Sequence, residues 1–209
     1  MNKHSLRYFQ ILLFITILPF AAFLPAHAVP KVGSPAPMFT AKDSNGRVHK
    51  LQDYSGKPVV LEWTNHDCPF VRKHYDTKNM QTLQKRYTEQ GVIWLTINSS
   101  ALGRQGHVTP EEANRLLSEE GSAQTAYLLD DSGEIGRLYD AKTTPHMFVI
   151  NKDGQLAYAG AIDDNSSSRH STVEGAVNYV AMALDALLAE KPVATASTQS
   201  YGCSVKYAG

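Results

Sequence analysis

Residues 61–70 read Leu-Glu-Trp-Thr-Asn-His-Asp-Cys-Pro-Phe, and this stretch decides the fold because a strand runs directly into a helix within it. The run from Val59 to Trp63 is apolar apart from one charge, which is typical of a buried parallel strand. Pro69 suits the first helical position, since its fixed φ is helical and its missing N–H would have had no partner. A helix N-terminus favours the thiolate form of Cys68, so we predict a reactive cysteine at a helix start. The alternative is that Cys68 is a small buried hydrophobe.

The first 28 residues have the pattern of a cleavable export signal. Lys3 and Arg7 are basic, residues 9–23 are mainly apolar, and Ala-His-Ala at 26–28 fits a signal-peptidase site. The apolar run is short for a membrane-spanning helix. We therefore expect an exported protein, periplasmic or secreted, with no stable membrane insertion after leader cleavage.

The composition excludes a strongly charged partner. Lys and Arg together number 20, as do Asp and Glu, and removing the leader leaves the mature chain slightly acidic. Nothing in this balance indicates binding to nucleic acid. We expect one domain over residues 29–190, followed by a tail over 191–209 that carries Cys203. In an oxidising compartment, two cysteines such as Cys68 and Cys203 are commonly joined in a disulfide.

The remaining pattern alternates strands and helices. A helix is predicted over residues 70–90, with a kink near Asp76-Thr77 where a cap-type pair could restart it. Further along, we expect strands at 92–97 and 126–129, helices from 109 and over 135–139, a hairpin of 147–150 with 156–160, and a helix over 173–188. This order specifies an α/β domain with helices on both faces of the sheet.

The combination of a strand, Cys68-Pro69 opening a helix, and Thr143-Thr144-Pro145 before a later hairpin resembles the thioredoxin fold. More narrowly, it resembles the redoxin, or peroxiredoxin-like (AhpC/TSA-type), branch with an enlarged middle, over roughly residues 32–188. The resemblance implies a central mixed sheet, with Cys68 as the nucleophile. It also implies that Thr144 and Pro145 form a cis-proline site beside the nucleophile that binds substrate.

The resemblance implies roles for four residues around Cys68. Glu62, on the strand, matches a buried acid that assists proton transfer, and the alternative is an exposed residue at a sheet edge. Asn65 stands where peroxiredoxins have Thr and can donate a hydrogen bond to a peroxide. Arg72 would stabilise the thiolate and polarise the O–O bond, or is a solvated helix residue. His66 is a candidate base or hydrogen-bond partner of the thiol.

The second cysteine is far away in the sequence. Thioredoxin-type reductases use Cys-x-x-Cys, and here Val71 stands three residues after Cys68, which excludes exchange by a local pair. We therefore expect Cys203 to act as the resolving cysteine. A group of redoxin-domain proteins ends in a similar Gly-Cys-Ser-(Val/Ile)-Lys segment. The alternative is a static disulfide between Cys68 and Cys203, whose long loop would stabilise the fold by about 4–5 kcal/mol.

A competing class is copper binding or delivery, with Cys68, His66, His74 and His146 as candidate ligands, since thiolate and imidazole suit Cu(I). The favoured function is that of an exported thiol-disulfide oxidoreductase or thiol peroxidase. Its expected partners are a peroxide or protein-disulfide substrate and a thiol reductant, and no cofactor is expected. The sequence leaves the choice between the two substrates open.

Overall fold

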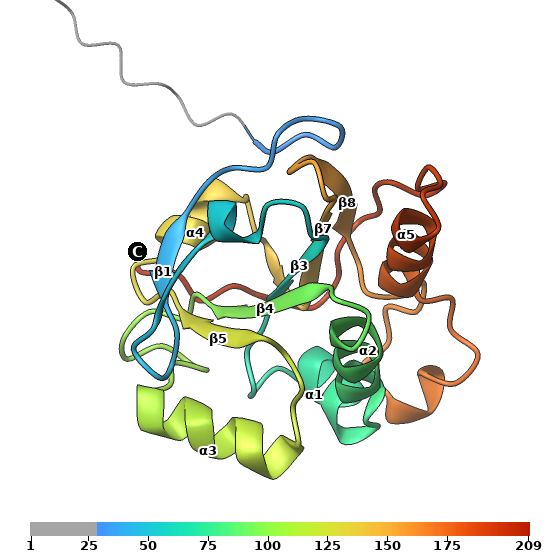
Figure 1. Ribbon diagram of the computed structural model, residues 1–209. Coiled ribbons are helices and arrows are strands. Elements are labelled where there is room, and N and C mark those ends of the chain that lie inside the picture. The colour runs from blue at the N-terminus through green and yellow to red at the C-terminus, as the bar shows by residue number, and fades with distance from the viewer. Residues whose placement is uncertain (1–28) are drawn as a thin grey trace, which may run out of the picture.

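The computed structural model describes residues 29–209, which form a central sheet with helices packed on it (Figure 1). The predicted export signal at residues 1–28 lies outside the described residues. Within residues 29–209, no helix is both long enough and apolar enough to cross a bilayer.

Five strands form the central sheet, in the spatial order β5-β4-β3-β7-β8. They are β3 (Val59–Trp63), β4 (Ile93–Asn98), β5 (Ala126–Leu129), β7 (His146–Ile150) and β8 (Leu156–Gly160). The first three run parallel, whereas β7 is antiparallel to both β3 and β8. Because β3 lies in the middle of the sheet, all five of its residues are buried. The predicted mixed sheet is confirmed, and so is the hairpin of β7 and β8.

Helices cover both faces of this sheet, as predicted. They are α1 (Pro69–Asp76), α2 (Asn79–Thr88), α3 (Pro110–Glu120), α4 (Glu134–Leu138) and α5 (Tyr179–Leu188), with short 3₁₀ helices η1 (Leu51–Tyr54) and η2 (His170–Thr172). Side chains alternate across β3. Val60 therefore joins the core under α1, α2 and α5, whereas Leu61 joins the core under α4. The second core is completed by the N-terminal hairpin of β1 (Thr40–Lys42) and β2 (Val48–Lys50).

The single helix predicted over residues 70–90 is wrong, because the structure has two helices there. The break falls close to the predicted kink. Thr77 donates its hydroxyl to the Lys73 carbonyl (2.7 Å), which satisfies a carbonyl of the last turn. Lys78 then takes a left-handed conformation with φ 60°, and α2 begins at the next residue.

The helix predicted over residues 173–188 begins later, at Tyr179. Gly175 has a φ of 78°, which is incompatible with a continuous helix. The side chain of Asn178 instead accepts a hydrogen bond from the Ala181 N–H (2.8 Å) and caps the true start. Val177 is consequently outside the helix and 45% exposed, although its spacing had matched the apolar face.

The C-terminal segment, residues 191–209, packs along the domain. Figure 1 shows it running back across the molecule after α5. Ala159 of the edge strand β8 donates its N–H to the Ala196 carbonyl and accepts from the Thr198 N–H. Further along, β9 (Cys203–Ser204) pairs antiparallel with β6 (Thr143–Thr144). This pairing brings the second cysteine to the loop that precedes Pro145.

Candidate active site

Cys68 occupies the N-cap of α1, as the sequence predicted. Its backbone N–H donates to the Asn65 carbonyl (3.0 Å), which closes the turn between β3 and the helix. Its own carbonyl accepts from the N–H of Arg72 (2.8 Å), the first hydrogen bond of the helix. The side chain is fully buried, so the thiol has no direct exposure to solvent.

The Thr144–Pro145 peptide bond is cis, which confirms that prediction. The Cys68 Sγ lies 3.1 Å from the Thr144 carbonyl oxygen and donates a hydrogen bond to it. Thr144 itself is buried. The thiol and the cis-proline loop are therefore in direct contact, although 76 residues separate Cys68 from Thr144.

The second cysteine reaches the same loop through backbone pairing. Cys203 lies opposite Thr144 in the β6–β9 register. The residue before it, Gly202, has a φ of 137°, and a Cβ atom there would lie 2.1 Å from the Thr144 carbonyl oxygen. Only glycine allows the tail to come this close. Thr144 thus touches both cysteines, one through its carbonyl oxygen and the other through strand pairing.

The pKa of Cys203 also reflects how close this residue lies to Cys68. Burial, the hydrogen bond with Cys68 and the electrostatic interaction with that neighbouring sulfur together raise the pKa of the Cys203 thiol to about 11. Cys203 is consequently protonated at neutral pH. Both cysteines are free thiols in this structure. A base must take the Cys203 proton before that sulfur can attack.

Glu62 lies in the middle of the sheet, and the alternative of an exposed edge position is wrong. It is 1% exposed. Its carboxylate accepts hydrogen bonds from Tyr75 (2.7 Å), Trp94 (2.7 Å), Gln84 (3.1 Å) and Thr96 (3.1 Å). Burial raises the pKa of Glu62, and these four hydrogen bonds oppose part of that effect. The group can therefore hold a proton at higher pH than an ordinary carboxyl.

Two of the predicted site residues, Asn65 and Arg72, form their contacts with groups other than the Cys68 thiol. The Asn65 amide nitrogen donates to Gln105, to its carbonyl (3.2 Å) and its side-chain oxygen (3.1 Å), and so holds the loop after β4. The Arg72 guanidinium forms ion pairs with Asp76 and, at 3.0 Å, with Glu120. These contacts engage both groups in this structure, so either would have to exchange partners to reach a peroxide.

His66 differs from these two because part of its side chain is unengaged. Its Nε2 lies 3.2 Å from the Asp67 carboxylate, and the ring is 27% exposed. Its Nδ1 is buried and has no hydrogen-bond partner among residues 29–209. A buried ring nitrogen without a hydrogen-bond partner is uncommon in proteins.

Sequence reasoning missed a buried polar cluster next to the cysteines. The Tyr201 cluster consists of Lys73 and His74 on α1, Asp163 after β8, and Tyr201 in the tail. Lys73 is fully buried, although lysine is among the residues that are almost never buried unless paired. Its carboxylate partner is 90 positions away in the sequence, so no local pattern signals the pair.

The four candidate copper ligands are not gathered at one site. Within residues 29–209, no group of three or more His, Cys, Asp or Glu side chains is placed to hold a metal ion. Both ring nitrogens of His74 are engaged, with Asn79 (2.8 Å) and Tyr201 (3.3 Å). His146 Nδ1 accepts from the Lys142 N–H (3.3 Å).

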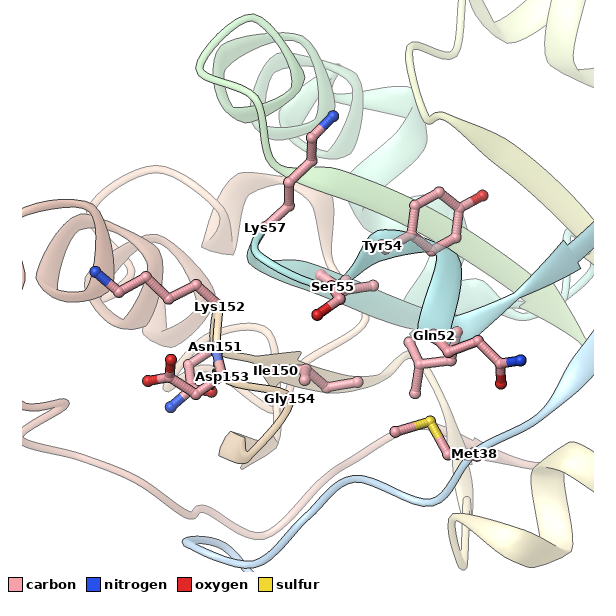
Figure 2. A pocket seen from close by; sticks show the side chains of 12 residues that line it. Met38, Gln52, Tyr54, Ser55, Lys57, Ile150, Asn151, Lys152, Asp153 and Gly154 are labelled. Atoms are coloured by element: carbon pink, nitrogen blue, oxygen red, sulfur yellow. Dashed lines mark hydrogen bonds between the residues drawn. The ribbon is translucent and has the colours of Figure 1, made fainter.

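Figure 2 shows a cavity lined in part by Met38, Tyr54, Ile150 and Lys152. Val59, the first residue of β3, also lines it, whereas Cys68 follows the end of that strand. Neither cysteine lines the cavity. This cavity is therefore separate from the thiol site.

Comparison with known proteins places these features in a family. Residues 32–159 match the model of the AhpC/TSA family. This region contains Cys68, the cis-proline and the whole central sheet except Gly160, the last residue of β8. The chain belongs to the AhpC/TSA family. The match ends before the tail that carries Cys203.

Relatives and solved structures agree with this assignment. The thiol-disulfide oxidoreductase ResA of Geobacillus thermodenitrificans is 27% identical over 137 residues, which cover 66% of this chain and 73% of that protein. An uncharacterized conserved protein from Geobacillus kaustophilus has a crystal structure with a TM-score of 0.75 and 29% identity, covering 85% of this chain and 93% of its own.

The thioredoxin-like fold is confirmed by a third comparison. A putative thiol:disulfide interchange protein DsbE from Chlorobium tepidum matches with a TM-score of 0.51 and 25% identity, covering 62% of this chain and 84% of its own. Together with AhpC/TSA membership, these findings show that the chain is a thiol-dependent oxidoreductase.

Proposed function

We propose that this chain catalyses thiol–disulfide exchange, with Cys68 as the nucleophile and Cys203 as the resolving cysteine. One observation carries the proposal, namely that Thr144 contacts both cysteines. Its carbonyl oxygen is 3.1 Å from Cys68 Sγ, and its backbone pairs with Cys203. Backbone pairing holds Cys203 in place without a covalent bond. The dithiol and disulfide forms can then interconvert with little movement of the tail.

The exchange proceeds in two balanced steps. The Cys68 thiolate attacks one sulfur of a substrate disulfide, and the other substrate sulfur leaves as a thiolate and takes up a proton. Cys203 then attacks Cys68 Sγ in the mixed disulfide, which releases the second substrate thiol. One substrate disulfide has been reduced, and one disulfide has formed between Cys68 and Cys203. An external thiol reductant returns the pair to the dithiol.

Proton transfer accompanies both steps. We assign it to His66 and Glu62, which precede Cys68 by two and six residues in the sequence. Because the pKa of Cys203 is raised to about 11, its attack needs a base. The unpartnered Nδ1 of His66 supports that role. Glu62, whose pKa is raised by burial, is the proposed proton relay beneath the site. Thr144 and Pro145 shape the substrate site. Asn65 and Arg72 would contribute only after exchanging their present partners.

A hydroperoxide is a second candidate substrate, and the position of β9 favours it. The strand already pairs with β6 beside Cys68, so a polypeptide cannot pair there unless the tail leaves. A hydroperoxide needs far less room. Attack by Cys68 would give a Cys68 sulfenic acid and release the alcohol or water. Cys203 would then condense with the sulfenic acid, releasing water and forming the same disulfide.

Export is part of this proposal and rests on the leader pattern at residues 1–28. An oxidising compartment would convert an isolated dithiol to its disulfide, so a dedicated reductant must maintain the cycle there. The N-terminal sequence of the protein isolated from its host tests this part. A chain beginning at Val29 supports it, and a chain that retains the leader in the cytosol contradicts it.

The roles of the two cysteines are tested by comparing Cys68→Ser with Cys203→Ser. The pre-reduced proteins are mixed with oxidised glutathione or hydrogen peroxide as alternative oxidants, without dithiothreitol, which would itself reduce a Cys68 intermediate. Cys68→Ser should abolish the reaction with either oxidant. Cys203→Ser should react once and stop at the Cys68 mixed disulfide or sulfenic acid, which the wild-type protein converts to the Cys68–Cys203 disulfide. Equal residual reaction in both variants would contradict the assigned roles. The ratio of the wild-type reaction rates with the two oxidants decides between the candidate substrates.

A further inference from the structure

A fully buried ion pair lies close to the active-site helix. Lys73 and His74 have no exposed surface, and Asp163 is 2% exposed. The Lys73 ammonium lies 3.3 Å from the Asp163 carboxylate and donates to the Asn165 carbonyl at 2.8 Å. Burying these groups carries a large desolvation cost, so such a pair adds little net stability. Its position therefore calls for a reason other than stability.

Tyr201 brings the tail into this ion pair. Its hydroxyl donates to Asp163 and accepts from Lys73 (3.4 Å) and His74 (3.3 Å). The histidine tautomer fits this arrangement. Because the Asn79 amide donates to Nδ1 at 2.8 Å, the ring proton is on Nε2, which faces the Tyr201 hydroxyl. Burial lowers the pKa of His74 to about 4, which keeps the ring neutral.

The cluster connects the two segments that carry the cysteines. Lys73 and His74 belong to α1, the helix that Cys68 caps. Tyr201 is two residues before Cys203, and Gly202 between them packs against the Thr144 carbonyl. The Tyr201 ring also lies 6.0 Å from the ring of Phe70, near the start of α1. A displacement of Tyr201 would be transmitted to Cys203 through a single glycine.

We propose that Tyr201 is a positioning residue, whose hydroxyl in the Lys73–His74–Asp163 site fixes the tail so that Cys203 faces Cys68. This inference rests on the proposed Cys68–Cys203 disulfide and assigns a role that the matched AhpC/TSA region, which ends before the tail, does not contain. The tail has other attachments, including the Tyr207 hydroxyl on the Ala141 carbonyl (2.8 Å). The Tyr207 hydroxyl holds the segment after Cys203, and Thr198 is held on β8 five residues before it, whereas Tyr201 is separated from Cys203 by Gly202 alone.

The test compares Tyr201→Phe with Tyr207→Phe in the full mature chain. Each substitution removes one tail hydroxyl and keeps the ring. The readout is the equilibrium between the dithiol and the Cys68–Cys203 disulfide in defined mixtures of reduced and oxidised glutathione. Hydrogen bonds to charged groups are strong enough that Tyr201→Phe should lower the equilibrium constant for disulfide formation by about tenfold. Tyr207→Phe should change it less than about twofold.

A second measurement separates positioning from general loosening of the fold. In the reduced protein, Tyr201→Phe should increase the alkylation rate of Cys203 by iodoacetamide several-fold, with no such increase in Tyr207→Phe. Equal effects of both substitutions, or none from Tyr201→Phe, would overturn the inference. Failure of the wild-type protein to form the disulfide in oxidised glutathione would instead refute the proposed function. The two failures are therefore distinguishable.

Discussion

The contact between Gly202 and the Thr144 carbonyl gives the sharpest prediction. In Gly202→Ala, the new methyl group would lie 2.1 Å from that oxygen, a distance that real Cβ contacts essentially never show. Reaching an acceptable separation requires a shift of about 1 Å between β9 and β6. The φ of 137° at this position also strains any residue with a Cβ. The substitution should therefore move Cys203 away from Cys68.

The expected effect is on the rate of disulfide closure. Because a misplacement of about 1 Å can cost on the order of 10²-fold in rate, Gly202→Ala should close the disulfide about 10²-fold more slowly than wild type. In the assay, a quench-flow instrument mixes the reduced protein with oxidised glutathione and stops the reaction with acid. The remaining thiols are then measured by mass analysis. Hydrogen peroxide provides the same readout for the second candidate substrate.

A matched control isolates the clash from the backbone strain. Gly175 also has a positive φ, 78°, but a Cβ atom there would meet nothing within 4 Å. Gly175→Ala therefore carries a backbone cost of about 1–3 kcal/mol without displacing the tail. Its closure rate should stay within about twofold of wild type. If Gly202→Ala closed the disulfide at the wild-type rate, the claim that pairing with Thr144 positions Cys203 would be refuted.

Two further predictions concern proton handling. Burial raises the pKa of Glu62 above its ordinary value of 4.5, so the folded chain binds this proton more tightly and loses stability as pH rises from about 4.5 through the raised pKa. In Glu62→Gln, the urea midpoint of unfolding should fall less between about pH 5 and pH 8 than in wild type. An equal fall in both proteins would contradict the claim that burying the ionised Glu62 carboxylate costs stability. His66→Ala should slow disulfide closure by about 10²-fold, the lower end of what a positioned general base contributes. Closure at the wild-type rate would exclude His66 as the base.

Local chemistry explains which parts of the fold were predictable. Val59–Trp63 is apolar except for Glu62, and Cys68-Pro69 marks the helix start, so both elements follow from neighbouring residues. The helix from Pro110 also follows, because Thr109 and Glu112 form a complete capping box. By contrast, Val177 matched the apolar spacing of α5 but lies outside it, because the Asn178 cap decides where that helix begins.

The parts of the site that could not be predicted depend on distant partners. The two-residue strand β9 is too short to show any periodicity, so its pairing with β6 left no pattern in the sequence. The burial of Lys73 depends on Asp163 and Tyr201, which come from two other segments. Asn65 and Arg72 stand at the expected positions, but their contacts with Gln105 and Glu120 are set by the loop after β4 and by α3.

The central claim is tested most directly by mass analysis of the reduced wild-type protein, before and seconds after one equivalent of oxidised glutathione or hydrogen peroxide. The account predicts the loss of two hydrogens, a peptide that links Cys68 to Cys203, and recovery of both thiols on addition of dithiothreitol. Two free thiols that persist with both oxidants would contradict it. A disulfide that forms once and resists dithiothreitol under native conditions would also contradict it, because the bond would then be structural.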